Sequence, residues 1–244
     1  MKSTTKGLVI REQTIGESDR LVTLLTADYG LVRAFVRGAK QMKSRLASST
    51  SLFAYSNFSI YRGKDAFVVD NAVPIEVFFD LRKDIVRLSL AQYFAQLAFE
   101  LGEEEHPSPE MLSVMLNSLH LLCNSNKDCR IIKTAVEFRL LSLGGYMPSI
   151  LACASCSTYE TDLMFFDTLD GCIYCENCGK AGAVACPKNV ITAIRFICLT
   201  EPKKIFSFSL SDENLNLLSS ISEKYLISRI QKNLQTLAFY KSLI

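Results

Sequence analysis

The chain has 244 residues, of which 49% are hydrophobic and 21% are charged, and its formal net charge is +2. This length suits two or three small domains, and the apolar content supports a buried core. Charged residues interrupt the apolar runs before the ~20 residues of a membrane-spanning helix, and the N-terminal segment lacks the hydrophobic stretch of a signal peptide. These features argue against a membrane-spanning or secreted protein.

The small net charge conceals an uneven distribution. Residues 1–64 contain eleven Lys/Arg and four Asp/Glu, a balance of +7, so the remaining 180 residues carry −5. A basic segment joined to an acidic remainder indicates that the first part meets a polyanion. The alternative is an ordinary solvated charged surface.

The first 70 residues carry the pattern of short β-strands. Segments rich in Leu, Val, Ile and Thr alternate with turn residues, such as Asp28-Tyr29-Gly30. Five strands without a clear intervening helix predict a small closed β-barrel of the OB type. The expected strands cover residues 7–13, 20–26, 31–37, a segment around 58–60, and 66–70.

A basic stretch begins in the expected strand 31–37 and continues into the loop that follows. One face of this strand is apolar, and the other carries Arg33, Phe35 and Arg37. On a barrel surface, Phe35 can stack on a base while the arginines contact phosphates, and Gly38 permits close backbone approach. The alternative is that Phe35 is part of the core. The candidate nucleic-acid-binding residues are Arg20, Arg33, Phe35, Arg37, Lys40, Lys43, Arg45, Arg62 and Lys64.

From about residue 80, apolar residues recur at steps of three and four, which is typical of helices. Ser108-Pro109-Glu110 is a helix-start signal, and Gly144-Gly145 is a helix-end signal. The acidic run 103–105 is expected to solvate a helix end. The expected helices cover about 85–101, 108–122, 130–143, 189–199, one that begins at Ser211, and a last one over 223–243.

Two cysteine pairs interrupt the helical part. Cys153 and Cys156 form the first pair, Cys175 and Cys178 form the second, and 18 residues separate them. This spacing predicts one structural Zn²⁺ per chain, held by four thiolates with no open position for a substrate. Cys172 and Cys186 remain alternative ligands. Nine cysteines, an odd number with a metal-type pattern, indicate the reducing cytoplasm.

The sequence does not present a catalytic set. The two histidines, His106 and His120, lie in an acidic loop and in an apolar helix, and a phosphate-binding Gly-Lys-Ser/Thr loop is missing. A zinc hydrolase or deaminase lacks the His-x-Glu that it would need beside the cysteines. We therefore expect a non-enzymatic protein, with an interaction adaptor as the second hypothesis.

Several segments, in consistent order, resemble the RecO family of recombination mediators. The first is Ile15-Gly-Glu-Ser-Asp-Arg-Leu-Val-Thr-Leu-Leu-Thr26, followed by Gly30 and the run from Arg37 to Arg45. The match continues through Phe138-Arg-Leu-Leu141, the two cysteine pairs and Asp170-Gly171. Cys172 departs from the small residue usual in the family, so the metal could bind in another register.

The resemblance implies three modules: an N-terminal OB-fold, a helical domain and an inserted zinc ribbon. The expected domains are a DNA-binding OB-fold at 1–80, helical parts at 81–150 and 183–244, and the ribbon at 151–182. The resemblance also implies binding of single- and double-stranded DNA, annealing of complementary strands, and action with RecR in loading RecA onto DNA coated by single-stranded DNA-binding protein. Family members bind the acidic C-terminal tail of that coating protein. Arg130, Lys133 and Arg139 are candidate contacts for the tail, and a solvated helix face is the alternative.

Overall fold

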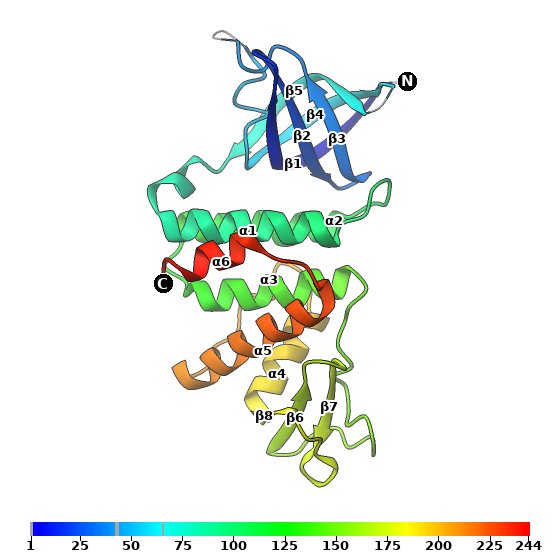
Figure 1. Ribbon diagram of the computed structural model, residues 1–244, viewed down its shortest axis with the longest axis vertical. Coiled ribbons are helices and arrows are strands. Elements are labelled where there is room, and N and C mark those ends of the chain that lie inside the picture. The colour runs from blue at the N-terminus through cyan, green and yellow to red at the C-terminus, as the bar shows by residue number, and fades with distance from the viewer. Residues whose placement is uncertain (1, 42–43, 65) are drawn as a thin grey trace. The chain divides into compact units, whose positions relative to one another are not determined.

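The computed structural model describes residues 2–41, 44–64 and 66–244 of an α+β chain. Strands dominate the N-terminal part and helices the remainder, as the sequence predicts (Figure 1). Two compact units are present: Met1–Ser125 together with Leu234–Ile244, and Asn126–Asn233. None of the described helices is long and apolar enough to cross a bilayer.

Five strands of the first unit form a closed barrel in the order β1-β2-β3-β5-β4. Neighbouring strands are antiparallel except β3 and β5, which meet in a short parallel pairing at Ala34 and Phe35. Closure removes the free strand edges that promote aggregation. The strands are β1 (Lys2–Ile15), β2 (Asp19–Thr26), β3 (Gly30–Val36), β4 (Ala54–Arg62) and β5 (Phe67–Val77).

Alternation along the strands separates the barrel core from its outer surface. Val32, Ala34 and Val36 on β3 are at most 2% exposed, and Phe58 and Ile60 on β4 are fully buried. The predicted apolar face of β3 is therefore confirmed. Strands β1 and β5 extend beyond the expected ranges, to residues 2 and 77.

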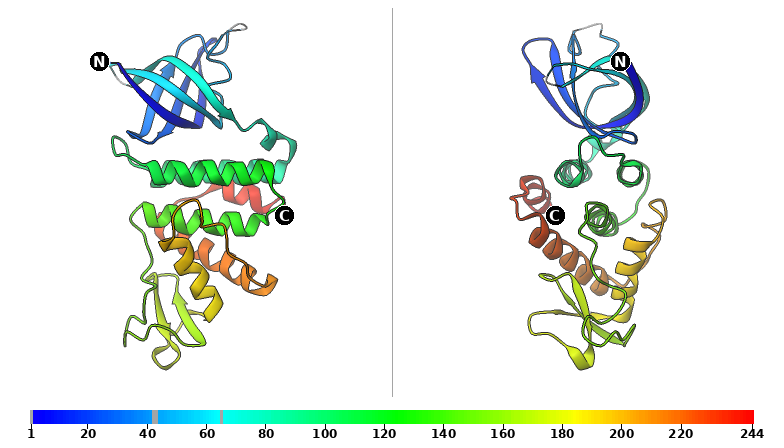
Figure 2. Two further views of the ribbon diagram at one scale, coloured as in Figure 1. Left: turned by 180° about the vertical axis from the view of Figure 1, so that it is seen from behind. Right: turned by 90° about the vertical axis from the view of Figure 1, so that its right-hand side faces the viewer.

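Three helices and a short 3-10 turn complete the first unit. α1 (Ile85–Leu101) and α2 (Pro109–Asn124) lie side by side at one end of the barrel, and α6 (Gln235–Lys241) lies beside α1 (Figures 1 and 2). The turn η1 (Phe79–Lys83) leads into α1. Asp84 begins α1 by accepting hydrogen bonds from the backbone of Val86 and Arg87. Pro109 stands in the first turn of α2, as predicted.

The second unit combines three helices with a small antiparallel sheet. Its helices are α3 (Cys129–Leu143), α4 (Lys188–Leu199) and α5 (Asp212–Ile230). The sheet has the order β7-β6-β8, from β6 (Leu163–Asp167), β7 (Cys172–Cys175) and β8 (Val184–Pro187). The rings of Phe138, Phe166 and Tyr225 pack with centroids 5.6–6.3 Å apart and join the sheet to α3 and α5.

The expected last helix, 223–243, is wrong. α5 begins at Asp212 and runs without a break to Ile230, and α6 begins only at Gln235. Gln231 takes the left-handed conformation with φ 50°, which ends α5. The polar sequence Gln231-Lys232-Asn233 offers little apolar surface to hold another helical turn. The division between the two compact units also falls here.

Candidate functional site

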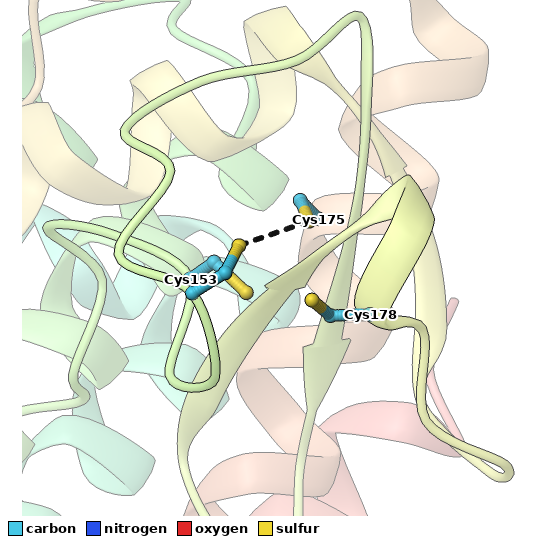
Figure 3. A group of neighbouring side chains, drawn as sticks. Cys153, Cys175 and Cys178 are labelled. Carbon is cyan, nitrogen blue, oxygen red and sulfur yellow. Dashed lines mark hydrogen bonds between the residues drawn. The ribbon is translucent and has the colours of Figure 1, made fainter.

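The four predicted cysteines come together at one point of the small sheet. Cys153 and Cys156 lie in the loop before β6, Cys175 ends β7, and Cys178 lies in the turn η2 (Glu176–Cys178). Their sulfur atoms all lie within 4.8 Å of one another, and those of Cys156 and Cys175 are 3.5 Å apart. Figure 3 shows Cys153, Cys175 and Cys178 pointing into the same small space. Sulfurs around a tetrahedral Zn²⁺ lie about 3.8 Å apart, given a Zn–S distance of ~2.3 Å.

Backbone hydrogen bonds hold the first pair in place. The N–H of Cys153 donates to Thr158 O and that of Ala154 donates to Ile173 O, both at 2.8 Å. Ser157 takes the left-handed conformation with φ 61°, and its N–H donates to Cys153 O at 2.9 Å. The loop is thus fixed to β7, which carries the second pair.

The acid–base properties of the cluster favour a bound cation. Burial raises the pKa of Cys153, but backbone N–H groups of Cys156, Cys175 and Ser155 outweigh burial and lower this pKa to about 6. The Cys178 thiol instead donates hydrogen bonds to Cys156 and Cys175, which favours its protonated form and raises its pKa to about 12. Four thiols this close lose their protons stepwise because thiolates repel one another. A divalent cation removes that repulsion and allows all four to ionise.

The two alternative ligands, Cys172 and Cys186, lie outside the cluster. The Cys172 thiol donates to Tyr174 Oη at 3.4 Å. Cys186 is fully buried and donates to Val184 O at 3.2 Å. The structure therefore gathers the four preferred cysteines in one compact group. Cys153 and Cys175 are buried, Cys178 is half-buried and Cys156 is exposed. Four thiolates would fill a tetrahedral coordination shell, so the group fits a closed structural site better than a catalytic one.

The outer face of β3 carries an aromatic residue between two cations. Arg33 and Arg37 are exposed, and Phe35 between them is half-buried. Phe35 therefore does not belong to the barrel core, which was the alternative reading of the strand. Its ring is partly accessible, as stacking on a base requires.

The basic loop after β3 is anchored at its beginning. Gly38 takes φ 63°, and its N–H donates to the Asp19 carboxylate at 2.8 Å. The N–H of Lys40 donates to Ser18 O at 2.9 Å. Lys40 and Arg45 are exposed, whereas Lys43 lies outside the described residues. Arg37 and Lys40 thus project from a segment that is tied to the β1–β2 turn.

Arg20 lies in a different environment from the other candidate cations. Its side chain is 18% exposed and lies 3.8 Å from Glu12. Its guanidinium donates to Ala47 O at 2.9 Å and to Thr50 Oγ1 at 3.4 Å. These contacts brace the loop between β3 and β4, which argues against a direct phosphate contact by Arg20.

A cavity of about 630 Å³, which we call the barrel pocket, lies where β3 approaches the β4–β5 turn. Three candidate cations line it, namely Arg33, Arg62 and Lys64, together with the rings of Tyr29 and Phe67. A second hollow on the other side of Arg33 includes Arg11, whose guanidinium lies 4.2 Å from the Phe99 ring centroid. Tyr29 lies in the predicted turn Asp28-Tyr29-Gly30 and Phe67 in the expected strand 66–70, but neither is among the candidate binding residues.

The three candidate partner-binding residues on α3 differ in accessibility. Lys133 is 3% exposed and Arg139 is 8% exposed, and Arg139 donates to Cys198 O. This burial argues against direct partner contacts by these two side chains. Arg130 is more accessible, and it pairs with Asp128 and Asp212.

Comparison with known proteins gives a consistent result along the chain. Residues 1–78 match the family model "Recombination protein O N terminal" and residues 82–238 match "Recombination protein O C terminal". The chain is 33% identical to the DNA repair protein RecO of Acetivibrio thermocellus, over 98% of this chain and 96% of the relative. It is 27% identical to that of Caldicellulosiruptor bescii, over 97% of each. Two family models in order and full-length similarity show that the chain belongs to the recombination protein O (RecO) family of DNA repair proteins.

Proposed function

We propose that this RecO-family protein binds single- and double-stranded DNA through the outer surface of its barrel and acts as a recombination mediator. The arrangement that carries the proposal is Phe35 between Arg33 on β3 and Arg37 just after it, next to the barrel pocket with Arg62 and Lys64. Cations with an interleaved aromatic ring are the usual means of binding single strands. Closure of five strands in the order β1-β2-β3-β5-β4 supports an OB-fold.

Mediation by such a surface needs no bond-making residue. Arg and Lys neutralise phosphates on two approaching strands and so reduce the repulsion that opposes their pairing. Base stacking and pairing then supply the driving force for annealing. On coated DNA, the protein needs only to weaken some contacts of the single-stranded DNA-binding protein, after which RecA can load with the help of RecR.

The remaining assignments are also proposals. RecR, RecA and the acidic tail of the coating protein are the proposed partners, in the cytoplasm at the nucleoid. For the tail, Arg130 is the accessible member of the three α3 candidates. The domain boundaries at 80, 150 and 182 are proposed as the limits of a barrel, a helical domain and its inserted ribbon. The thiolate-only donor set favours Zn²⁺ as the metal of the ribbon.

Strand annealing tests the proposal. Complementary oligonucleotides are coated with the single-stranded DNA-binding protein, and duplex formation is followed with and without this protein. We expect faster annealing that declines as salt rises, because the phosphate contacts are screened and counterion release weakens. Unchanged annealing and negligible oligonucleotide binding at moderate salt would instead favour an interaction adaptor.

A further inference from the structure

The acidic run Glu103–Glu105, which we call the acidic loop, is fixed against the barrel. Leu31 N–H on β3 donates to Glu103 O at 2.9 Å, and Glu104 forms backbone bridges with Gly30 and Leu31. The loop joins α1 to α2 and follows directly on the end of α1. The sequence predicts that this run solvates a helix end, but its backbone extends the pairing of β3.

The close fit of the loop depends on a glycine. A Cβ on Gly30 would lie 2.2 Å from Glu103 O and 2.3 Å from His106 O, so no other residue fits there without moving the loop. Gly30 also has φ 59°. Glu105 itself takes φ 60°, a left-handed conformation that is unfavourable outside glycine and is held by the surrounding contacts. The backbone of the loop is therefore held at the barrel by specific contacts, and it carries Glu104 and Glu105 to this position.

The carboxylates of the loop lie among the cations assigned to DNA. Glu105 pairs with Arg62 at 3.0 Å across the mouth of the barrel pocket. Glu104 lines the barrel pocket and the second hollow, and Arg33 lines both as well. Glu105 thus presents a carboxylate oxygen to the Arg62 guanidinium in the manner of a DNA phosphate, and Glu104 places a second carboxylate in the hollows that Arg33 lines.

We propose that the acidic loop is an intramolecular phosphate mimic that competes with DNA for the cations of the barrel pocket. This inference rests on the proposed function of the barrel surface. The Arg62–Glu105 pair is exposed, with side chains 73% and 64% accessible, so it is weak and water screens it. A DNA strand displaces the carboxylates because its phosphates contact many cations at once. A single phosphate contacts too few cations to compete with the carboxylates.

Removal of the two carboxylate charges is the direct test. The variant Glu104→Gln/Glu105→Gln keeps the side-chain shape and the backbone pairing with β3. Its binding to a labelled single-stranded oligonucleotide should tighten by about fivefold at low salt, the size expected for releasing exposed pairs. Its salt dependence should steepen by about 0.7 in log–log slope for each cation released.

A matched control removes two negative charges elsewhere in the same unit. Glu76→Gln/Asp80→Asn lowers the negative charge equally, but neither residue lines the barrel pocket or the second hollow. Equal tightening by the control and the loop variant would show a general charge effect and would overturn the proposal. Equal thermal unfolding midpoints of the two variants and the parent establish that folding is unchanged.

A double-variant cycle separates failure of the loop proposal from failure of the DNA-binding proposal. Arg62→Ala should weaken DNA binding more in the Glu105→Gln background than in the parent, because the pair with Glu105 otherwise occupies Arg62. Equal weakening in both backgrounds would overturn the loop proposal alone. If Arg62→Ala weakens binding in neither background, Arg62 does not contact DNA. Both its assignment to the DNA surface and the loop proposal are then wrong.

Discussion

Lys133 lies on helix α3 but is buried, unlike the solvated surface position that the sequence allows. Its ammonium group lies 2.8 Å from Glu137 and 3.1 Å from Glu223, and Glu137 is fully buried and also accepts from Ser222 at 2.6 Å. Burial alone would lower the pKa of Lys133, but the two carboxylates outweigh it and raise this pKa above its ordinary value. The buried ion pairs of Lys133 therefore join α3 to α5.

The buried pair makes Lys133 a sensitive position for stability. Lys133→Met should lower the free energy of unfolding by about 3–5 kcal/mol at neutral pH, because it leaves the buried Glu137 without its partner charge. Lys133→Met/Glu137→Gln should recover part of that loss. Urea unfolding measures both, and a loss under about 1 kcal/mol for the single variant would contradict the prediction.

The pH dependence of this contribution follows from the direction of the shift. Because the folded-state pKa of Lys133 is raised, the stabilisation is fully present below the unfolded pKa and is lost as pH rises through the folded one. The stability difference between the parent and Lys133→Met should therefore stay constant near neutrality and shrink only at strongly alkaline pH. A difference that shrinks already below pH 9 would not fit this account.

Among the residues proposed to bind DNA, Phe35 has the most specific proposed role, which is stacking on a base. Phe35→Leu keeps an apolar side chain but removes the ring face, so single-strand binding should weaken by about fivefold or more, equivalent to ~1 kcal/mol of stacking. Val73→Ala on β5 serves as a control, since this exposed apolar residue lies outside the proposed surface. Equal affinity of Phe35→Leu and the parent would remove the stacking role.

At the scale of elements, the small sheet of the second unit lies beside a cluster of four cysteines from the loop before β6, from β7 and from η2. Its three strands have only four or five residues each, so the sheet depends on packing or another restraint outside its own backbone pairing. A shared metal would link the loop before β6 to the end of β7 and supply that restraint. The aromatic cluster of Phe138, Phe166 and Tyr225 then joins this sheet to the helices.

Exchange of the second cysteine pair tests the metal. Cys175→Ser/Cys178→Ser should lose bound zinc and unfold less cooperatively, whereas the parent should carry one zinc per chain. Cys172→Ser is the matched control and should keep its metal, because the Cys172 thiol contacts Tyr174 and not the cluster. Elemental analysis and thermal unfolding give the two readouts. Zinc-free parent protein, purified without chelator, would contradict the assignment.

At the scale of the whole molecule, the uneven charge distribution is the main support for the proposed DNA binding. The basic surplus of residues 1–64 is carried largely by exposed side chains at β3, the following loop and the β4–β5 turn. The acidic remainder includes the acidic loop that reaches back to this surface within the first unit. On the two proposals together, we expect DNA affinity to reflect the difference between phosphate attraction and competition by the acidic loop.

Loss of two cations from this surface should have a general effect on DNA binding. Arg37→Ala/Lys40→Ala should weaken binding to all sequences similarly and reduce the salt slope by about 1.4 for single strands, at ~0.7 per phosphate contact. Lys203→Ala/Lys204→Ala removes the same charge from exposed positions of the second unit. If both variants lower affinity equally, net charge and not a defined surface governs binding.

The sequence by itself determined the features that depend on local spacing. The two-residue spacing of the paired cysteines predicts the cysteine cluster, and alternation along β3 predicts its buried face. Ser108-Pro109 predicts the start of α2. Each of these signals acts over a few residues and can be found without the fold. The family could be predicted for a related reason, since its motifs are short segments in fixed order.

Only the tertiary structure decided the features that depend on contacts between distant residues. Arg20 is tied to Ala47, Lys133 to Glu223 and Arg139 to Cys198, and no local pattern distinguishes these cations from the exposed Arg33 and Lys64. The acidic loop contacts β3 from more than 70 residues away, through a glycine that otherwise reads as part of a turn. Whether a charged side chain braces the fold or stays available on the surface depends on the groups that the tertiary structure brings next to it.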